Sequence, residues 1–309
     1  MKNIKFYSRI SALAILAFML SYFPGFAQEE ATGDSTQAPV KERPARPAFE
    51  SGLLFDAATT TLQPSKTLEM IIQHRFGTMD NGISDFYGIW APSNIRLGMN
   101  YSILDNLMVG IGATKFNKME DIQIKYNVLQ QTRSNKIPVT VSLYEVIGID
   151  GSPDEKFGVN YKFSNRFNFF SQIIISRRFN DMFSFQIAPG FTHYNSVDST
   201  MDHDKISISF AGRVKFSPQS SFVIGADIPL RIQGISEHTA EFNETSSSWN
   251  DVYSNISIGY EVATSTHAFH LYVSSGQGIL PQENIMFNKN DFFDGGILIG
   301  LNITRLWSF

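Results

Sequence analysis

Hydrophobic and polar residues alternate one by one along most of the chain from residue 67 onward. Residues 121–128 are the clearest case, with isoleucine, tyrosine and valine at even positions and aspartate, glutamine, lysine and asparagine at odd ones. Because successive side chains of a strand point to opposite faces, this pattern predicts strands with one apolar and one polar face. Twelve such strands are expected, at residues 67–76, 94–103, 107–113, 121–128, 139–149, 166–178, 182–194, 205–216, 222–233, 252–262, 268–274 and 295–309.

The lengths of the strands and of their connections predict a barrel in a membrane. Most strands run to about ten residues, as a tilted membrane strand requires, whereas strands of soluble domains usually have about five or six. The connections tend to alternate between long and short, with 77–93 and 151–165 long and 105–106 and 180–181 short. We therefore expect an all-β fold, a single up-and-down antiparallel transmembrane β-barrel of about 12 strands with short periplasmic turns and long outer loops.

Two prolines, Pro189 and Pro229, fall inside expected strands. Proline has no N–H to donate to a strand ladder, and a closed barrel has no free edge where that loss would be harmless. A bulge or a local break is therefore expected at each.

The first 66 residues lack the alternation. Residues 1–27 begin with basic residues, continue through an apolar run and end at Ala27, which predicts a secretory signal peptide cleaved there. Residues 28–48 are rich in Glu, Pro, Thr and Ala and predict a disordered periplasmic leader. Residues 49–66 carry a short apolar patch and are expected to form an N-terminal packing segment or plug, or an added periplasmic strand. Residues 67–309 are expected to form the barrel, with both mature termini in the periplasm.

The last expected strand ends on Phe309, with Trp307 two positions earlier and Arg305 as the one charged residue on its apolar face. An arginine near a strand end can extend its charged head to the water interface. A closing strand that ends on an aromatic residue resembles the C-terminal signal of bacterial outer-membrane barrels. We therefore expect the barrel-assembly machinery to be a partner.

The composition agrees with a membrane protein and excludes several kinds of site. Only 17 % of the 309 residues are charged, against roughly 25 % in an ordinary soluble protein. The chain has no cysteine, which excludes disulfides, thiolate catalysis and cysteine metal sites. The net charge is −4 and no basic run is present, so nucleic acid is not an expected partner. No cofactor is expected.

Three segments carry a resemblance to a known family: Leu-Glu-Met-Ile-Ile-Gln-His-Arg-Phe-Gly at 68–77, Asn-Ile-Arg-Leu-Gly-Met-Asn-Tyr at 94–101 and Leu-Met-Val-Gly-Ile-Gly at 107–112. From about residue 49 to the end, the chain resembles an uncharacterised family of Gram-negative outer-membrane β-barrel proteins, a domain of unknown function. The resemblance implies this fold and the outer membrane of a Gram-negative bacterium. It implies no activity and no catalytic residue.

The polar parity carries ionisable groups that the bilayer would exclude from its own side, so they are expected to line the lumen. These candidates are Glu69, Arg75, Arg96, Asp121, Lys125, Arg166, Arg178, Lys205, Arg213, Lys215, Asp227, Arg231 and Glu261. Their excess of basic groups favours a porin-like channel or transporter for small, anionic solutes. The alternative to an open path is a lumen closed by its own salt bridges, since a twelve-stranded barrel is narrower than an open porin. The alternative functions are a structural or docking barrel that anchors a partner, and a lipid-modifying enzyme.

An enzyme would need a catalytic group, and none is expected here. His74 lies on the outward parity, where some barrel lipases carry their histidine, but no serine follows at the lipase spacing. The acidic loop 198–204, with His203, lacks the glycine and the terminal glutamate of a calcium loop, so no metal is expected. Aromatic residues at strand ends are expected at the membrane rim, where rings prefer the headgroup level. They are Trp90, Trp249, Trp307 and Phe309. His267 and His270, at the entry to an expected strand, are also interpreted as rim residues.

Overall fold

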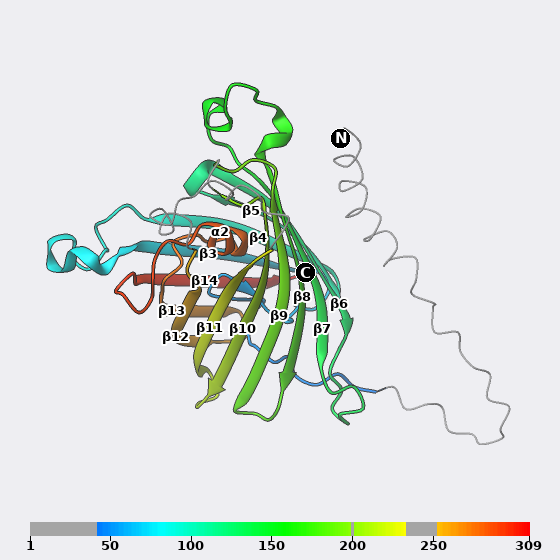
Figure 1. Ribbon diagram of the computed structural model, residues 1–309. Coiled ribbons are helices and arrows are strands. Elements are labelled where there is room, and N and C mark those ends of the chain that lie inside the picture. The colour runs from blue at the N-terminus through cyan, green and yellow to red at the C-terminus, as the bar shows by residue number, and fades with distance from the viewer. Residues whose placement is uncertain (1–41, 199–200, 233–251) are drawn as a thin grey trace, which may run out of the picture. The chain divides into compact units, whose positions relative to one another are not determined.

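A computed structural model of the protein describes residues 42–198, 201–232 and 252–309, all within one compact unit, Glu42–Phe309. The expected signal peptide, the leader up to residue 41 and residues 233–251 lie outside the described residues. Twelve antiparallel strands close into a barrel in chain order, and the last strand pairs with the first (Figure 1). They are β3 (Thr67–Thr78), β4 (Asn94–Leu104), β5 (Leu107–Thr114), β6 (Met119–Leu129), β7 (Thr140–Ile149), β8 (Phe167–Arg178), β9 (Phe183–Tyr194), β10 (Asp204–Lys215), β11 (Ser220–Arg231), β12 (Asn255–Ala263), β13 (His267–Ser274) and β14 (Leu298–Ser308).

The predicted fold class is confirmed, including the number of strands and their up-and-down order. The connections after β3, β5, β7, β9, β11 and β13 share one rim, and most of them are long; we call it the long-loop rim. The connections after β4, β6, β8, β10 and β12 share the other, the short-turn rim. The described connections of the long-loop rim contain the 3-10 helices η1 (Met79–Asp85), η2 (Phe116–Lys118), η3 (Asp154–Phe157) and η4 (Phe163–Arg166).

The barrel is apolar outside and polar inside, the reverse of a soluble domain. In β4, Leu97 and Met99 are about half exposed on the outer face, whereas Arg96 and Asn100 on the inner face are only 2 % and 6 % exposed. An apolar outer wall of this kind suits contact with acyl chains. Among the residues that the structure describes, no helix is both long enough and apolar enough to cross a membrane.

Both strand prolines lie where a ladder is interrupted. Pro189 pairs with Ile208 of β10, but towards β8 the pairing stops at Gln172–Gly190 and resumes at Ile175–Ile187 in the same register. The β11–β12 ladder ends at Asp227, two residues before Pro229. Neither site has a bulge, because a local gap in the pairing is enough to accommodate the missing donor.

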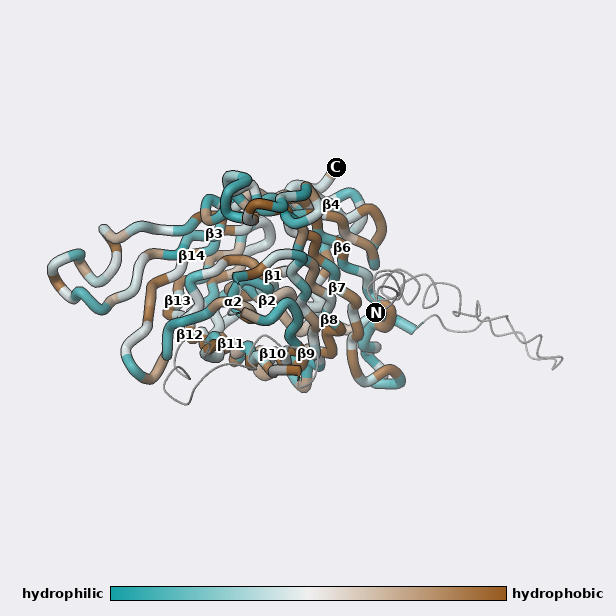
Figure 2. Tube along the Cα trace, turned by 45° about the horizontal axis from the view of Figure 1, so that its top comes forward, coloured by the Kyte–Doolittle hydropathy of each residue, from teal (hydrophilic) through white to brown (hydrophobic). Residues whose placement is uncertain are grey.

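Three further elements complete the described chain: β1 (Leu53–Leu54), β2 (Ala57–Ala58) and the helix α2 (Pro281–Phe287). β1 and β2 pair antiparallel with Leu53 opposite Ala58, and α2 belongs to the connection between β13 and β14. The ring of barrel strands encloses all three (Figure 2). The lumen is therefore occupied by two parts of the same chain.

Candidate functional site: a lumen closed from both rims

Residues 48–61, which contain β1 and β2, form a hairpin inside the barrel; we call it the closing hairpin. Its approach lies at the short-turn rim, where the amide of Ala45 donates to the carbonyl oxygen of Gln131 in the β6–β7 turn at 2.7 Å. Its exit lies at the same rim, where Lys66 donates to the carbonyl of Ser102 at 2.8 Å. The chain thus enters the lumen, turns back at Phe55 and leaves before β3 begins.

The threonines after β2 explain how this two-stranded segment can be buried although it is not part of the barrel sheet. The hydroxyl of Thr59 donates to the carbonyl oxygen of Ser51 at 2.6 Å, and that of Thr61 donates to the carbonyl of Phe49 at 2.8 Å. These side chains satisfy backbone acceptors that a lone two-residue ladder leaves unpaired. The hairpin therefore carries part of its own hydrogen-bond complement into the lumen.

Two apolar clusters pack the hairpin against the wall. Phe55 is 1 % exposed, and its ring lies 4.7 Å from that of Tyr272, centroid to centroid. A β-carbon on Gly225 or Gly259 would come within 3.2 or 3.0 Å of the Phe55 ring, so these glycines provide the space for it. On the opposite side, Ala58 belongs to a second buried cluster, together with Tyr144, Val146, Phe170, Ile174, Ala188 and Ile285.

Helix α2 closes the lumen from the long-loop rim. It begins with Pro281 at its first turn, and the side chain of Glu283 accepts from the amides of Ile279 and Leu280 at 3.1 and 3.2 Å. Burial raises the pKa of Glu283 to about 7, although these two hydrogen bonds oppose the rise. Ile285 on the same helix is fully buried. The helix thus places one carboxyl group in the dry interior of the barrel.

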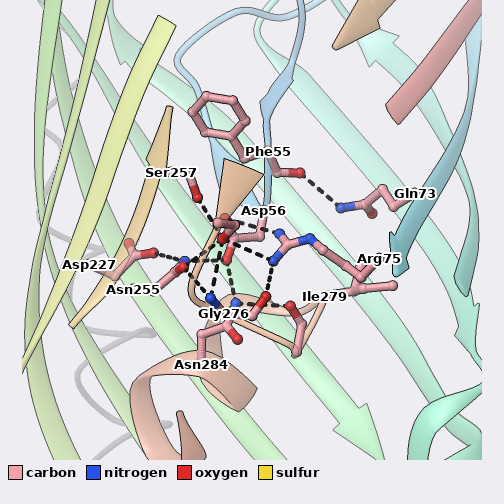
Figure 3. Close-up of polar contacts among 12 residues, drawn as sticks. Phe55, Asp56, Gln73, Arg75, Asp227, Asn255, Ser257, Gly276, Ile279 and Asn284 are labelled. Carbon is pink, nitrogen blue, oxygen red and sulfur yellow. Dashed lines mark hydrogen bonds and ion pairs between the residues drawn. The ribbon is translucent and has the colours of Figure 1, made fainter. Parts of the chain in front are cut away.

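The hairpin and α2 meet at Asp56 (Figure 3). Its Oδ2 accepts from the side-chain amides of Asn255 on β12, at 2.8 Å, and of Asn284 on α2. Its Oδ1 lies 3.5 Å from the guanidinium of Arg75 on β3, which is fully buried. Arg75 in turn donates from Nε to the hydroxyl of Tyr272 at 2.9 Å and from Nη1 to the carbonyl of Gly276. One carboxylate therefore joins the hairpin, the wall and the α2 connection.

Two further contacts tie the hairpin to basic groups of the wall. Glu50 Oε1 accepts from Arg213 Nη1 at 2.9 Å and from Lys215 Nζ at 2.6 Å. Burial acts to raise the pKa of Glu50, but the hydrogen bonds and charges of Lys215 and Arg213 outweigh it, so the pKa is lowered. Lys125 Nζ donates to the carbonyl oxygens of Gly52 and Thr59 at 3.0 and 2.9 Å.

An ion pair of the wall itself spans three strands. Arg96 on β4 reaches Asp121 on β6 with two parallel hydrogen bonds, of 2.8 Å from Nε and 2.7 Å from Nη2. Between them on β5 lies Gly112, which pairs with Gly98 on one side and Asp121 on the other. Because glycine has no side chain, the guanidinium and carboxylate can lie flat over β5.

Most of the predicted lumen residues lie buried on the inner face, none more than 7 % exposed. These are Glu69, Arg75, Arg96, Asp121, Lys125, Lys205, Arg213, Asp227 and Glu261. Three others lie at the rims: Arg166 donates to the carbonyls of Asp150 and Ser152, Arg178 pairs with Asp181, and Lys215 contacts Glu50. Arg231 is in β11, and its side chain is outside the described part.

Sequence reasoning missed His270, interpreting it as a rim residue. It is fully buried on the inner face, and its Nε2 lies 3.2 Å from Glu261 Oε1. The signal was available, because His270 shares the inward parity of β13 with Tyr272 and Ser274. The closing contacts of Glu50 and Asp56 had no such signal, since the hairpin has no periodic pattern.

The predicted rim aromatics fall at different places. Trp90 is 74 % exposed in the loop after β3 and stacks on Phe86 with ring centroids 5.5 Å apart. Phe309 is 80 % exposed at the short-turn rim, where its amide donates to Lys66. Trp307 lies beside Arg305 near the end of β14. Trp249 lies outside the described residues.

The residues considered for enzyme and metal chemistry lie at two separate places in the chain. The ring of His74 lies 4.3 Å from that of Phe76, centroid to centroid, at an interplanar angle of 53°, and its Nδ1 is buried with no hydrogen-bond partner in the described chain. In the loop before β10, His203 Nδ1 lies 2.7 Å from the carbonyl of Tyr194. Across 42–198, 201–232 and 252–309, no group of three or more His, Cys, Asp or Glu residues is placed to hold a metal ion.

Comparison with known proteins bears on the family and the fold. A family model described as "Membrane bound beta barrel domain (DUF5777)" matches residues 49–307. No curated protein matches the chain.

Several solved barrels are similar in outline. The NanC porin has a TM-score of 0.47 at 8 % identity, covering 78 % of this chain and 99 % of its own. Outer membrane phospholipase A from Escherichia coli has a TM-score of 0.38 at 12 % identity, covering 80 % and 95 %. LpxR from Salmonella typhimurium has a TM-score of 0.35 at 10 % identity, covering 79 % and 100 %. At this level of similarity the three carry no information on activity.

Proposed function

The chain belongs to the family of membrane-bound β-barrel domains DUF5777, and from this premise we propose that it is an outer-membrane barrel that passes small anionic solutes through a gated lumen. The short-turn rim faces the periplasm and the long-loop rim faces outward, as in up-and-down barrels of this type. The closing hairpin is the periplasmic gate, and the α2 connection is the outer one.

The observation that carries the proposal is the charge relation between hairpin and wall. The hairpin contributes the carboxylates Glu50 and Asp56, which form ion pairs with three cations of the wall, Arg75, Arg213 and Lys215. When the hairpin leaves, these cations lose the carboxylates that pair with them, and a buried charge without a counter-charge is costly. An anionic solute in the lumen would restore the lost charge neutralisation.

The way the hairpin is held also supports displacement rather than permanent closure. Lys125 bonds to backbone carbonyls of the hairpin, which water or a solute oxygen can replace. The hydroxyl of Thr60 in the hairpin contacts the wall at Ser176, with the two oxygens 2.5 Å apart. These polar contacts can be exchanged for water when the hairpin leaves, and its buried apolar residues Phe49, Leu54 and Phe55 must then separate from the wall as well.

A disulfide lock tests the proposal directly. The natural chain has no cysteine, so Thr60→Cys with Ser176→Cys would form a single pair, placed where two hydroxyls already touch. In planar bilayers we expect the oxidised variant to stay silent and the reduced variant to open in steps. A salt gradient should give a reversal potential that favours anions. Each single cysteine variant is the control and should respond to neither oxidant nor reductant.

The gating proposal would be contradicted if the reduced form carried no current and deletion of residues 48–61 also left folded barrels without current. That result would favour the docking barrel, whose lumen never opens. Equal currents in the oxidised and reduced forms would show that solutes do not pass where the hairpin lies.

A further inference from the structure

A groove of about 320 Å³ lies on the outer face of the barrel near the short-turn rim. Three adjacent strands, β13, β14 and β3, contribute its walls. It is lined by Met70, Ile72, His267, Phe269, Ile303 and Arg305. These residues belong to the outward parity, so the groove opens to whatever surrounds the barrel rather than to the lumen.

The strand register orders the groove into two rows. At the level nearer the rim, Arg305 pairs with His267 on one side and Met70 on the other. One step further from the rim, Ile303 pairs with Phe269 and Ile72. A row with a cation is thus followed by a fully apolar row, in the direction that leads from headgroups to acyl chains.

Arg305 is prepared for a ligand with negative charge. It is exposed, and its guanidinium lies 4.9 Å from the ring centroid of Trp307, which orients it along the wall. No carboxylate of the described chain forms an ion pair with it. Beside it, the ring of His267 stacks parallel on Phe269, with an interplanar angle of 4°.

We infer that this groove binds one anionic phospholipid, with its phosphate at Arg305 and His267 and an acyl chain along Ile303 and Phe269. The inference rests on the membrane location of the family and is independent of whether the lumen opens. Charge complementarity selects the lipid, because a guanidinium without an acid partner in the described chain attracts a headgroup of net negative charge, whereas the choline cation of phosphatidylcholine offsets its phosphate. The apolar row offers an acyl chain a surface to pack against, which a free phosphate ion could not use.

Native mass spectrometry of the full mature protein in detergent tests the site. Phosphatidylglycerol, phosphatidylcholine and inorganic phosphate are added separately, to wild type, Arg305→Gln and Arg305→Lys. The matched control is Arg177→Gln, because Arg177 also lies near the short-turn rim, over the ring of Phe179 at 5.3 Å, but does not line this groove. The unboiled gel mobility of each variant reports whether the barrel is folded.

We expect one phosphatidylglycerol per wild-type barrel to bind more tightly than phosphatidylcholine, with no adduct of inorganic phosphate. Removal of the charge in Arg305→Gln should weaken binding of phosphatidylglycerol roughly fivefold, while Arg305→Lys and Arg177→Gln should retain it. A second variant, Ile303→Asn, keeps the cation but places an amide in the apolar row, and should weaken both lipids.

Three results would overturn the inference. Equal affinity for the two lipids would indicate ordinary annular contact, and equal loss in Arg305→Gln and Arg177→Gln would indicate general surface charge. A dimer that Arg305→Gln dissociates would show that the groove seats a second copy of the chain instead.

Discussion

Substitution of Gly112 by alanine should break the Arg96–Asp121 ion pair without touching either charged residue. An added β-carbon would lie 2.5 Å from Asp121 Oδ2 and 2.6 Å from Arg96 Cζ, too close for either group to stay. Gly112 pairs with Gly98 and with Asp121 across neighbouring strands, so the backbone cannot move aside without disturbing two ladders. The side chains must separate instead.

The magnitude follows from the burial of the pair. The side chains of Arg96 and Asp121 are 3 % and 0 % exposed, so separated charges would find little water. Breaking a buried pair typically costs about 3 to 5 kcal/mol. Gly110→Ala on the same strand is the matched control, because its β-carbon would collide with the neutral amide of Asn100. Asn100 donates to Glu69 Oε2 at 2.9 Å, so displacing it disturbs one hydrogen bond to a carboxylate and should cost about 1 to 3 kcal/mol.

Urea unfolding of the protein folded into lipid vesicles, followed by tryptophan fluorescence, measures the free energy of unfolding of both variants. Gly112→Ala should lose clearly more stability than Gly110→Ala. In a background where Arg96→Met and Asp121→Leu have already removed the pair, the loss caused by Gly112→Ala should fall to the level of the control. The reasoning is refuted if Gly112→Ala costs the same in both backgrounds, because the strain would then lie in the strands.

Three further predictions concern the closed lumen. Lys125→Met removes two charge-assisted hydrogen bonds to the hairpin and should raise the open probability in planar bilayers at least tenfold, while Lys115→Met at the exposed long-loop rim should leave it unchanged. Because burial raises the pKa of Glu283 to about 7, protonation of Glu283 stabilises α2 inside the lumen fully below pH 4.5, and this stabilisation is lost as the pH rises through 7. The open probability should therefore rise over this pH range, and Glu283→Gln should remove this pH dependence. The pKa of Glu50 is lowered, so its effect on stability has the opposite pH dependence: its contacts with Arg213 and Lys215 should be lost in acid, below about pH 4.5. Glu50→Gln should make the hairpin equally sensitive to added protease at pH 7 and pH 4.

The sequence was sufficient for the barrel wall because the wall is periodic. A strand with lipid on one face and a polar interior on the other must alternate, so the boundaries of β6 could be placed within two residues from residues 121–128 alone. The proline interruptions could also be anticipated, since the missing N–H is a local property. Whether a proline produces a bulge or a gap in the strand pairing depends on the neighbouring strands, and the sequence alone does not distinguish these two outcomes.

The content of the lumen could not be predicted from the same signal. The closing hairpin has two-residue strands, and its contacts, such as that between Asp56 and Arg75, join positions that no local pattern relates. Helix α2 has seven residues, almost all of them buried, so it has no amphipathic stripe to reveal which face packs. His270 differs, because its parity in β13 pointed inward and its position near a strand end misled the interpretation.

Asp56 makes the two closures depend on each other. Its carboxylate is buried, accepts from Asn284 of α2 and Asn255 of the wall, and forms an ion pair with Arg75 of the wall. If α2 withdraws, Asp56 loses one donor and stays in a site that still excludes water, so the cost of keeping the hairpin tip inside rises. If the hairpin withdraws, Asn284 loses one of its two acceptors and keeps the carbonyl of Gly278. Because each segment binds better when the other is in place, displacement of either from its own rim loosens the other, which is a coupling between the two sides of the membrane.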